Sequence, residues 1–233
     1  MNRQDELKKN CALAAVKQIT SGMVVGLGTG STANYMIDEL GKKCRDKSFQ
    51  IKGIPTSERT AQRAQTAGIE LISLETHSDI DLTIDGTDQF DPHLSLIKGH
   101  GGALLREKIV AAASIKMVVI TDDSKQTSHL GTDLAVPVEV LPFGYPSVAK
   151  QIAKLSAKVT QRLDSKTGQP FVTDSGNWII DCDFGTIEHP ADLEATLNLI
   201  PGVVENGLFV GQADMLFIGS EEGVEVMHRV SPS

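Results

Sequence analysis

Short apolar runs alternate with helix-like segments through the first half of the chain. The apolar run "MVV" at 23–25 is too short for a helix and rich in β-branched residues, which is typical of a buried strand. A glycine-rich turn, "GLGTGST", follows it, and a helix is expected over about 31–42. Further strands are expected in "IKGIPTS", "IELISL", "IDLTID" and "KMVVIT", with one helix after "IKGIPTS" and another in "ALLREKIVAAAS" before "KMVVIT". This alternation predicts an α/β fold with a Rossmann-like, mostly parallel sheet covered by helices on both faces.

The ends of the early helices can also be predicted. Ser31 or Thr32 is expected to be the N-cap of the helix after the glycine-rich turn, because a hydroxyl there accepts an unbonded backbone N–H. The next helix is expected to begin near Glu58 and to end at Gly68, since glycine is favoured just past a last turn. The amino-terminal segment has charges of both signs and lacks the apolar core of a signal peptide. No run reaches the roughly 18 apolar residues of a membrane span, so a cytoplasmic protein without membrane partners is expected.

The pattern changes near residue 130. A strand in "LAVPVEVLP" precedes a helix in "PSVAKQIAKLSA", where Pro146 suits the first turn. Antiparallel strands are expected in "KVTQRL", "QPFVT" and "NWIID", then a helix in "PADLEATLNLI" and a closing strand in "GVVENGLF". This order predicts a smaller ferredoxin-like α+β domain at 131–207. The tail "ADMLFIGSEEGVEVMHR" is expected to return two strands to the first sheet, giving a Rossmann-like domain of 1–130 and 208–233.

Composition limits the possible partners. The 233 residues carry a formal net charge of −8, which argues against nucleic acid, because binding to phosphate backbones needs a basic face. Cys11, Cys44 and Cys182 are odd in number and form no C-x-x-C pair, so reduced thiols are expected instead of disulfides or a zinc knuckle. The six histidines show no H-x-H or H-E-x-x-H spacing, so no metal site is predicted.

The glycine-rich turn matches neither common nucleotide motif. Counted from Gly26 and Gly28, the third glycine of the dinucleotide fingerprint would fall on Ser31, and the acidic residue that the fingerprint needs at the end of the second strand is missing at the end of "IKGIPTS". No lysine precedes Ser31, so the Walker pattern fails as well. A turn whose N–H groups and two hydroxyls meet a helix N-terminus suits one small phosphate. A plain tight turn between strand and helix is the alternative.

Charged residues follow several of the expected strands. Asp85 and Asp88 are expected just past the strand that ends at Ile84, where α/β proteins bind ligands. Lys98 and Lys125 each follow another strand, and the helix after Lys98 carries a carboxylate at position 107. Solvation explains any one of these charges. Five of them at one edge of one sheet indicate a binding site instead.

Four motifs, "GLGTGST", "DGTDQFD", "KGHGGALLREK" and "DDSKQ", resemble the ribose-5-phosphate isomerase A family in order and spacing. The similarity continues through "DLAVPVEVLP", "VTDSGNWIID" and "IPGVVENGLF", and so extends over nearly the whole chain. The resemblance implies an enzyme of the pentose phosphate pathway that interconverts D-ribose 5-phosphate and D-ribulose 5-phosphate without a cofactor. It also implies a homodimer or homotetramer.

The resemblance also assigns the residues of the site. The implied substrate-binding residues are Thr29, Gly30, Ser31, Thr32, Asp85, Gly86, Thr87, Asp88, Lys98, Gly99, His100, Gly101 and Lys125. Glu107 is implied to be the catalytic residue that accepts the proton. Two residues depart from the family pattern. His100 is bulky where smaller residues occur, and Gln89 replaces an acid after Asp88, so affinity is expected to change more than activity.

The chemistry needs these residue types. Aldose–ketose isomerisation moves a proton between C2 and C1 through an enediolate, which requires a base and a fixed cation for the developing oxyanion. We expect Glu107 to be the base and Lys98 the cation, with Asp85 and Asp88 handling hydroxyl protons and ring opening. The phosphate is expected on Ser31 and Thr32 at the helix N-terminus. Lys125 is expected as its counter-charge, and Lys8 is a weaker candidate.

Two other functions fit parts of the sequence. A non-catalytic sugar-phosphate sensor would use the same loops, but it would need an output module for which the chain has no basic patch. A nicotinamide dehydrogenase is disfavoured by the broken fingerprint.

Overall fold

Residues 2–229 are described by a computed structural model, in which the chain divides into two compact units. Unit 1 comprises the described residues of Met1–Thr87, Arg106–Gln126 and Gly211–Ser233, and unit 2 comprises Asp88–Leu105 and Thr127–Val210. The division expected from the sequence, 1–130 with 208–233 against 131–207, places residues 88–105 in the first part. The structure groups them with unit 2 instead.

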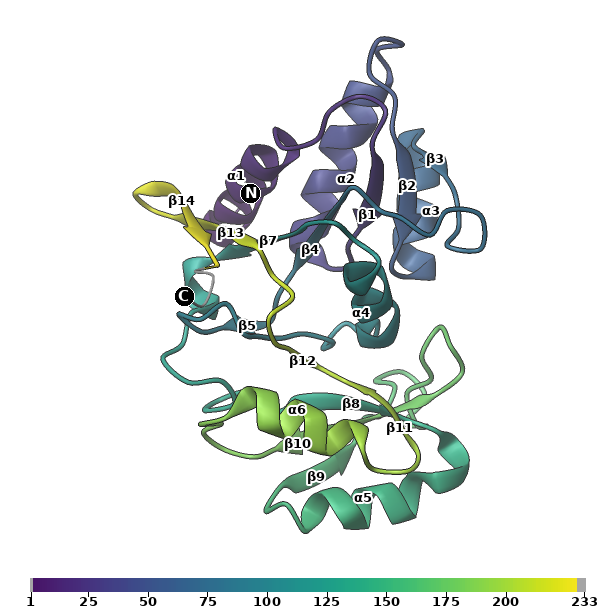
Figure 1. The fold of residues 1–233 in the computed structure, drawn as a ribbon, viewed down its shortest axis with the longest axis vertical. Helices are drawn as coiled ribbons and strands as arrows, with labels where there is room; N and C mark the ends of the chain where they lie inside the picture. Colours follow the sequence, from purple (N-terminus) through teal and green to yellow (C-terminus); the bar gives the residue numbers. More distant parts are fainter. Residues whose placement is uncertain (1, 230–233) are drawn as a thin grey trace. The chain divides into compact units, whose positions relative to one another are not determined.

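Unit 1 is built on a mostly parallel sheet, here called the large sheet (Figure 1). Its strands are β1 (Val24–Leu27), β2 (Lys52–Pro55), β3 (Glu70–Leu71), β4 (Leu82–Gly86), β7 (Met117–Asp122), β13 (Met215–Ser220) and β14 (Gly223–His228). They lie in the order β14-β13-β7-β4-β1-β2-β3, and only β13 and β14 pair antiparallel. The chain extends the sheet from β1 through β2 in one direction and from β4 through β7 in the other. Ligands of open α/β sheets bind at the carboxyl edge of such a switch point.

The helices of unit 1 are α1 (Arg3–Val16), α2 (Ser31–Cys44), α3 (Glu58–Ala67) and α4 (Leu104–Ala112), the last belonging to unit 1 from Arg106 onward. The predicted ends of α3 are confirmed. Ser57 is its N-cap and accepts the Thr60 N–H at 3.1 Å, and Gly68 ends it in the left-handed conformation at φ 83°. The predicted return of two carboxyl-terminal strands to the first sheet is also confirmed.

The predicted N-cap of α2 is wrong. The cap position falls on Gly30, at φ 123°, and no side chain caps the helix. Because glycine tolerates this conformation, the chain turns one residue earlier than expected. Ser31 and Thr32 therefore lie inside the first turn, where their backbone N–H groups have no partner within the helix.

Unit 2 contains the predicted ferredoxin-like arrangement. Its elements are β8 (Val136–Val140), α5 (Tyr145–Ala153), β9 (Lys158–Gln161), β10 (Trp178–Asp183), α6 (Pro190–Asn198) and β11 (Val203–Asn206). The antiparallel sheet has the order β11-β8-β10-β9, so the chain follows the β-α-β-β-α-β pattern. Pro146 occupies the first turn of α5, as predicted.

Two strand predictions for unit 2 are wrong. "QPFVT" forms only isolated bridges, from Pro170 to Leu163 and from Val172 to Trp178. The predicted closing strand divides between two sheets: β11 joins the ferredoxin-like sheet, while β12 (Leu208–Phe209) joins β6 (Leu96–Ile97) and β5 (Gln89–Phe90) in a small antiparallel sheet. The apolar residues do not reveal such a change of sheet, because they run through "GVVENGLF" on both sides of the break.

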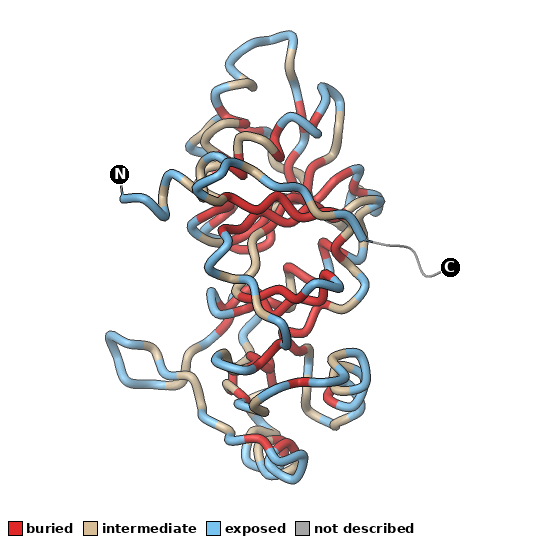
Figure 2. Tube along the Cα trace, turned by 90° about the vertical axis from the view of Figure 1, so that its left-hand side faces the viewer, coloured by how far each residue is buried: buried red, intermediate tan, exposed pale blue. Residues whose placement is uncertain are grey.

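Each unit has its own core. Buried residues follow the strands within each unit (Figure 2). In unit 1 side chains of α1 and α2 pack with those of the large sheet, for example Cys11, Met36 and Ile84. In unit 2 Val148 of α5 and Leu197 of α6 pack with the ferredoxin-like sheet. Within residues 2–229 every helix is too short or too polar to cross a bilayer.

Candidate active site

The glycine-rich turn after β1 is joined to the end of β4. Asp85 Oδ1 accepts the N–H of Thr29 at 2.9 Å and that of Gly86 at 2.7 Å, and Gly28 donates its N–H to Ile84 O at 3.0 Å. A methyl group on Gly28 would stand 2.5 Å from Asp85 Cα, so only glycine fits there. The sequence predicts Asp85 just past the strand. It lies within β4 instead, has no exposed surface, and holds the turn.

Beneath the turn lies a buried hydroxyl cluster made of Thr29, Thr56, Ser57 and Thr60. Thr29 Oγ1 lies 2.7 Å from Thr56 Oγ1 and donates to Ser57 Oγ at 2.8 Å. Thr60 Oγ1 donates to the carbonyl of Gly28 at 3.1 Å. The Thr29 hydroxyl is thus engaged within the protein, and the cluster supports the turn from below. The only signal for the cluster in the sequence is the hydroxyl-rich start of α3.

The start of α2 offers a site for an anion. Ser31 and Thr32 are its first residues, at the positive end of the helix dipole. Lys8 of α1 donates its Nζ to Ser31 Oγ at 3.3 Å. Lys125 lies in a short 3₁₀ turn, Asp123–Lys125, directly after β7, whose carboxyl end lies at the same edge of the sheet. These groups supply positive charge to one side of an acidic chain.

Glu107 lies in the first turn of α4 and is only 4% exposed. One turn further along the helix, the Val110 side chain packs on β1 and β4. The contact is close: a methyl group added to Gly26 of β1 would stand 2.7 Å from Val110 Cγ1 and 2.9 Å from Cβ of Thr83 in β4. Residues three apart on a helix share a face, so Glu107 lies on the face turned toward the sheet. Crossover helices run opposite to parallel strands, which places Glu107 nearer than Val110 to the carboxyl edge.

In unit 2, Asp88 and Lys98 lie at one end of the hairpin formed by β5 and β6. Asp88 donates its N–H to Ile97 O at 2.9 Å, and Lys98 donates its N–H to Gly207 O at 2.9 Å. The Lys98 side chain is 2% exposed, and its Nζ lies 5.4 Å from the centre of the Phe209 ring. The ring face attracts the ammonium and limits its motion.

The expectation that all five charged groups line one sheet edge is wrong. Asp85 and Lys125 belong to the ends of β4 and β7 in the large sheet, whereas Asp88 and Lys98 belong to the small sheet. The cause is the hairpin itself, whose strands of two residues each are too short for a periodic pattern.

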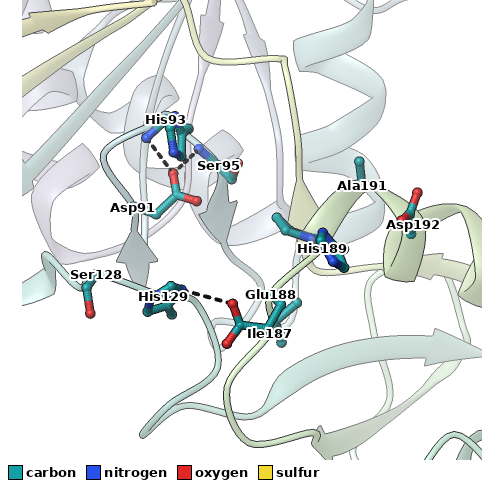
Figure 3. Close-up of a pocket in the computed structure, with 11 residues that line it drawn as sticks. Asp91, His93, Ser95, Ser128, His129, Ile187, Glu188, His189, Ala191 and Asp192 are labelled. Carbon is teal, nitrogen blue, oxygen red and sulfur yellow. Dashed lines mark hydrogen bonds and ion pairs between the residues drawn. The ribbon is translucent and has the colours of Figure 1, made fainter.

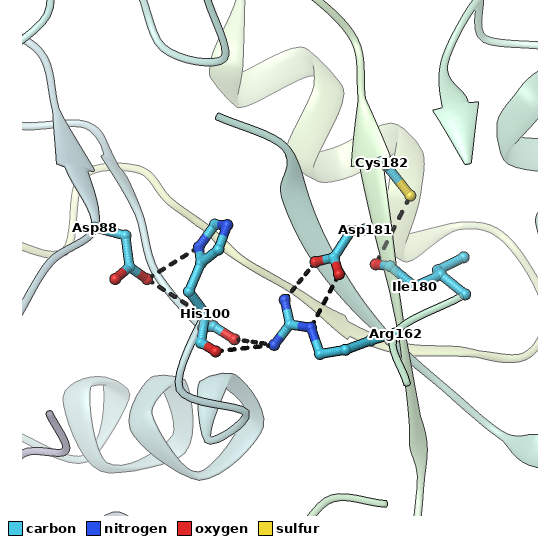
Figure 4. A network of polar contacts seen from close by, with 7 residues as sticks. Asp88, His100, Arg162, Ile180, Asp181 and Cys182 are labelled. Atoms are coloured by element: carbon cyan, nitrogen blue, oxygen red, sulfur yellow. Dashed lines mark hydrogen bonds and ion pairs between the residues drawn. The ribbon is translucent and has the colours of Figure 1, made fainter. Parts of the chain in front are cut away.

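Both departures from the family pattern have clear contacts. His100 donates its N–H to Asp88 Oδ2 at 3.0 Å, and its Nδ1 lies 3.2 Å from the same oxygen (Figure 4). Burial alone would raise the pKa of the Asp88 carboxyl, but the hydrogen bonds from His100 and the charges of His100 and Lys98 lower that pKa below its usual value. Gln89 Oε1 accepts the Gly131 N–H at 2.8 Å, so the Gln89 side chain joins β5 to the segment around Gly131 within unit 2.

A pocket of about 430 Å³ elsewhere in unit 2 gathers histidines that are distant in sequence, among them His93, His129 and His189 (Figure 3). Among residues 2–229 no group of three or more His, Cys, Asp or Glu side chains is arranged to hold a metal ion. None of the residues predicted for the site lines this pocket.

Comparison with known proteins decides the family. The family model described as "Ribose 5-phosphate isomerase A (phosphoriboisomerase A)" matches residues 52–223. The chain is 50% identical to ribose-5-phosphate isomerase A of Gloeobacter violaceus, with 96% of each chain covered. It superimposes on the ribose 5-phosphate isomerase A of Methanocaldococcus jannaschii with a TM-score of 0.93 at 39% identity, covering 97% of this chain and 99% of that one. A D-ribose-5-phosphate isomerase in complex with phospho-erythronic acid gives a TM-score of 0.95 at 40% identity, with 98% and 100% covered.

The chain belongs to the ribose 5-phosphate isomerase A family. It is an aldose–ketose isomerase that interconverts D-ribose 5-phosphate and D-ribulose 5-phosphate in the pentose phosphate pathway. The match extends over both units and includes all four of the motifs that carry the resemblance. The sensor is not favoured, because the similar proteins are enzymes.

Proposed function

We propose that Glu107 is the base of this isomerase and that Lys98 stabilises the oxyanion of the enediolate. The observation that carries the proposal is the burial of two opposite charges in the family motif "KGHGGALLREK", Glu107 at 4% and Lys98 at 2% exposure. Ionised side chains are almost never so enclosed unless they are paired or serve chemistry.

The proposed reaction begins from the open-chain aldehyde of ribose 5-phosphate. The Glu107 carboxylate removes the proton from C2, and the electron pair forms the C1–C2 double bond while the carbonyl oxygen on C1 becomes an oxyanion. Glu107 then returns its proton to C1. The proton of the C2 hydroxyl passes to the oxyanion on C1, a transfer we assign to Asp88, so that C1 becomes a CH₂OH group and C2 becomes the ketone of ribulose 5-phosphate. One carboxylate therefore serves as base and then as acid.

Lys98 would act mainly in the transition state. Its ammonium, fixed beside the Phe209 ring, supplies a positive charge that needs no reorientation as the oxyanion develops. In the Gly99–Gly102 loop the N–H groups of His100 and Gly102 are bonded to Asp88 and to Gly99 O, so further donors would come from the N–H groups of Gly99 and Gly101. Losing one such donor typically raises the barrier by about 2.7–4 kcal/mol.

The phosphate would bind at the start of α2, at Ser31 and Thr32, with Lys8 and Lys125 as counter-charges. Support comes from the Lys8–Ser31 contact and from the 14-residue length of α2. This group does not react, so its binding energy is available to orient the sugar.

Asp85, Asp88 and the substrate-binding backbone complete the proposed site. Asp85 Oδ1 accepts two backbone N–H groups, so its first task is to hold the turn. Hydroxyl-proton transfer and ring opening fall more naturally to Asp88, whose side chain is 30% exposed. Thr29, Gly30, Gly86, Thr87 and Gly101 would contribute through their backbone groups.

The ligand of one similar protein fits this scheme. Phospho-erythronic acid, bound by a D-ribose-5-phosphate isomerase, carries a phosphate and a carboxylate. The carboxylate has two oxygens that share a negative charge, as the enediolate does. We therefore propose that this compound binds the present chain more tightly than ribose 5-phosphate does. Self-association and a cytoplasmic location also remain proposals for this chain.

Glu107→Gln tests the base. The amide cannot accept the proton, so kcat is expected to fall at least about 10³-fold, while the Kd for phospho-erythronic acid, measured by calorimetry, stays within about threefold. Near-normal turnover would reject Glu107. Glu58→Gln is the matched control. Glu58 of α3 pairs with Arg106 of α4, and loss of the Glu58 charge should leave kcat unchanged.

Lys98→Ala tests the oxyanion contact. A contact made in the transition state lowers kcat more than it raises KM. An unchanged kcat would remove Lys98 from the mechanism.

A further inference from the structure

The peptide that joins Gly99 to His100 is held from both sides within unit 2. Its N–H, on His100, donates to Asp88 Oδ2 at 3.0 Å. Its carbonyl, on Gly99, accepts from Nη1 of Arg162 at 2.9 Å, and the next carbonyl, on His100, accepts from the same nitrogen at 3.1 Å. Figure 4 shows Arg162 on one side of this peptide and Asp88 on the other.

Arg162 is itself fixed. It follows β9 directly, and Asp181 of β10 accepts from both its Nε, at 2.9 Å, and its Nη2. The guanidinium is planar, so this two-point pairing also sets the direction of Nη1. The side chains are 13% exposed for Arg162 and 26% for Asp181, so water screens the pair little.

The two charged side chains match the dipole of the Gly99–His100 peptide. The positive guanidinium meets the oxygen of the Gly99–His100 peptide, and the negative carboxylate of Asp88 meets its N–H. Hydrogen bonds in such a chain polarise and strengthen one another. Gly99 makes this orientation possible at φ 100°, and a methyl group there would stand 2.7 Å from Leu104 Cβ.

We propose that Arg162, held by Asp181, is a positioning residue of the isomerase: it fixes the Gly99–His100 peptide and, through it, Asp88 and the loop that begins at Lys98. The inference rests on the proposed roles of Lys98 and Asp88. Neither Arg162 nor Asp181 is expected to touch the substrate. The pair acts on the reaction by holding the loop in its working position.

The test uses Arg162→Met, Arg162→Lys and Asp181→Asn in the full chain. Arg162→Met removes both carbonyl contacts, so kcat should fall at least about tenfold, the ratio produced by about 1.4 kcal/mol of barrier. KM should change by less than about threefold, because the phosphate contacts lie elsewhere. Arg162→Lys keeps one charged donor and should recover part of kcat. The kcat of Asp181→Asn should lie between that of wild type and that of Arg162→Met.

Amide hydrogen exchange gives a readout independent of activity. The His100 N–H is bonded to Asp88 and the Gly102 N–H to Gly99 O, so both should exchange at least about tenfold faster in Arg162→Met. Arg63→Met is the matched control, because Arg63 forms the same two-point pair with Asp38 in unit 1. It should leave kcat and exchange at these amides unchanged.

Three outcomes would overturn the inference: an unchanged kcat in folded Arg162→Met, a rise in KM alone, or unchanged exchange at His100 and Gly102. If Arg162→Met does not fold, Arg162→Lys and Asp181→Asn decide by the same measurements. Lys98→Ala separates this inference from the proposed function. If Lys98→Ala lowers kcat and the Arg162 variants do not, only the inference fails. If Lys98→Ala keeps full turnover, the proposed function fails.

Discussion

Replacing Gly28 by alanine tests how closely β1 and β4 approach at the site. The new methyl group would stand 2.5 Å from Asp85 Cα and would also overlap Asp85 Oδ1. Both neighbours belong to a residue with no exposed surface, in the middle of the large sheet, so neither can move aside cheaply. Overpacking of this kind costs about 1–3 kcal/mol. Displacing Asp85 Oδ1 from the Thr29 N–H or the Gly86 N–H would cost about 1.5–3 kcal/mol more, since the acceptor is charged.

The expected loss of folding free energy is therefore about 2.5–6 kcal/mol, a large part of the roughly 5–15 kcal/mol that stabilises a typical protein. Urea unfolding followed by far-ultraviolet circular dichroism measures it as a lower midpoint at an unchanged slope. Gly86→Ala is the matched control at the same edge, because its methyl group would meet only Thr29 O at 3.8 Å and Ile120 O at 4.0 Å. That variant should stay within about 1 kcal/mol of wild type. Equal midpoints for the two variants would refute the steric argument.

Three further predictions concern single ionisable groups. Lys8→Met should raise KM about fivefold at nearly constant kcat, as loss of up to about 1 kcal/mol of charge attraction predicts, and an unchanged KM in initial-rate assays would remove Lys8 from the phosphate site. The pKa of Asp88 is lowered in the folded protein, so its ionised form adds stability above about pH 3.9, its unfolded value, and that stability is lost as the pH falls through the lower folded pKa. The difference in unfolding free energy between wild type and Asp88→Asn should thus be present at pH 6 and shrink in acid, and a pH-independent difference would contradict it. Burial raises the pKa of both Cys11 and Cys182 to about 12, so Ellman's reagent at pH 8 should label neither in the folded protein and all 3 cysteines in urea.

Local signals in the sequence predicted the elements whose ends are set by local physics. α3 begins at Glu58 and ends before Gly68 as expected, because the hydroxyl cap of Ser57 and the left-handed Gly68 act within a few residues. Pro146 fits the first turn of α5 for the same reason. The order of strands and helices was sufficient for both sheet types, since alternation favours parallel pairing and the second half follows the ferredoxin-like order.

Contacts between distant segments could not be predicted in this way. Gly207 accepts the Lys98 N–H and donates its own N–H to Pro137 O, which is why the chain changes sheets there. Arg162 reaches a loop more than 60 positions away, at Gly99, through a side chain whose direction is set by Asp181. In both cases the partner in the hydrogen bond is far away in the sequence, so the composition and periodicity near either residue do not predict the contact.

The two carboxylates of "DGTD" show why residue type alone does not assign a role. Asp85 lies within a central strand, where its oxygen accepts two N–H groups of the turn and no surface is left to solvent. Asp88, three residues on, has passed the strand end and keeps 30% of its side chain exposed. His100 and Lys98 hold the pKa of Asp88 low against burial, so it is ionised at neutral pH. A carboxylate that must take up and release hydroxyl protons needs both access and a fixed charge state. The same residue type therefore holds the glycine-rich turn at one position and, in the proposed site, is available for proton transfer at the other.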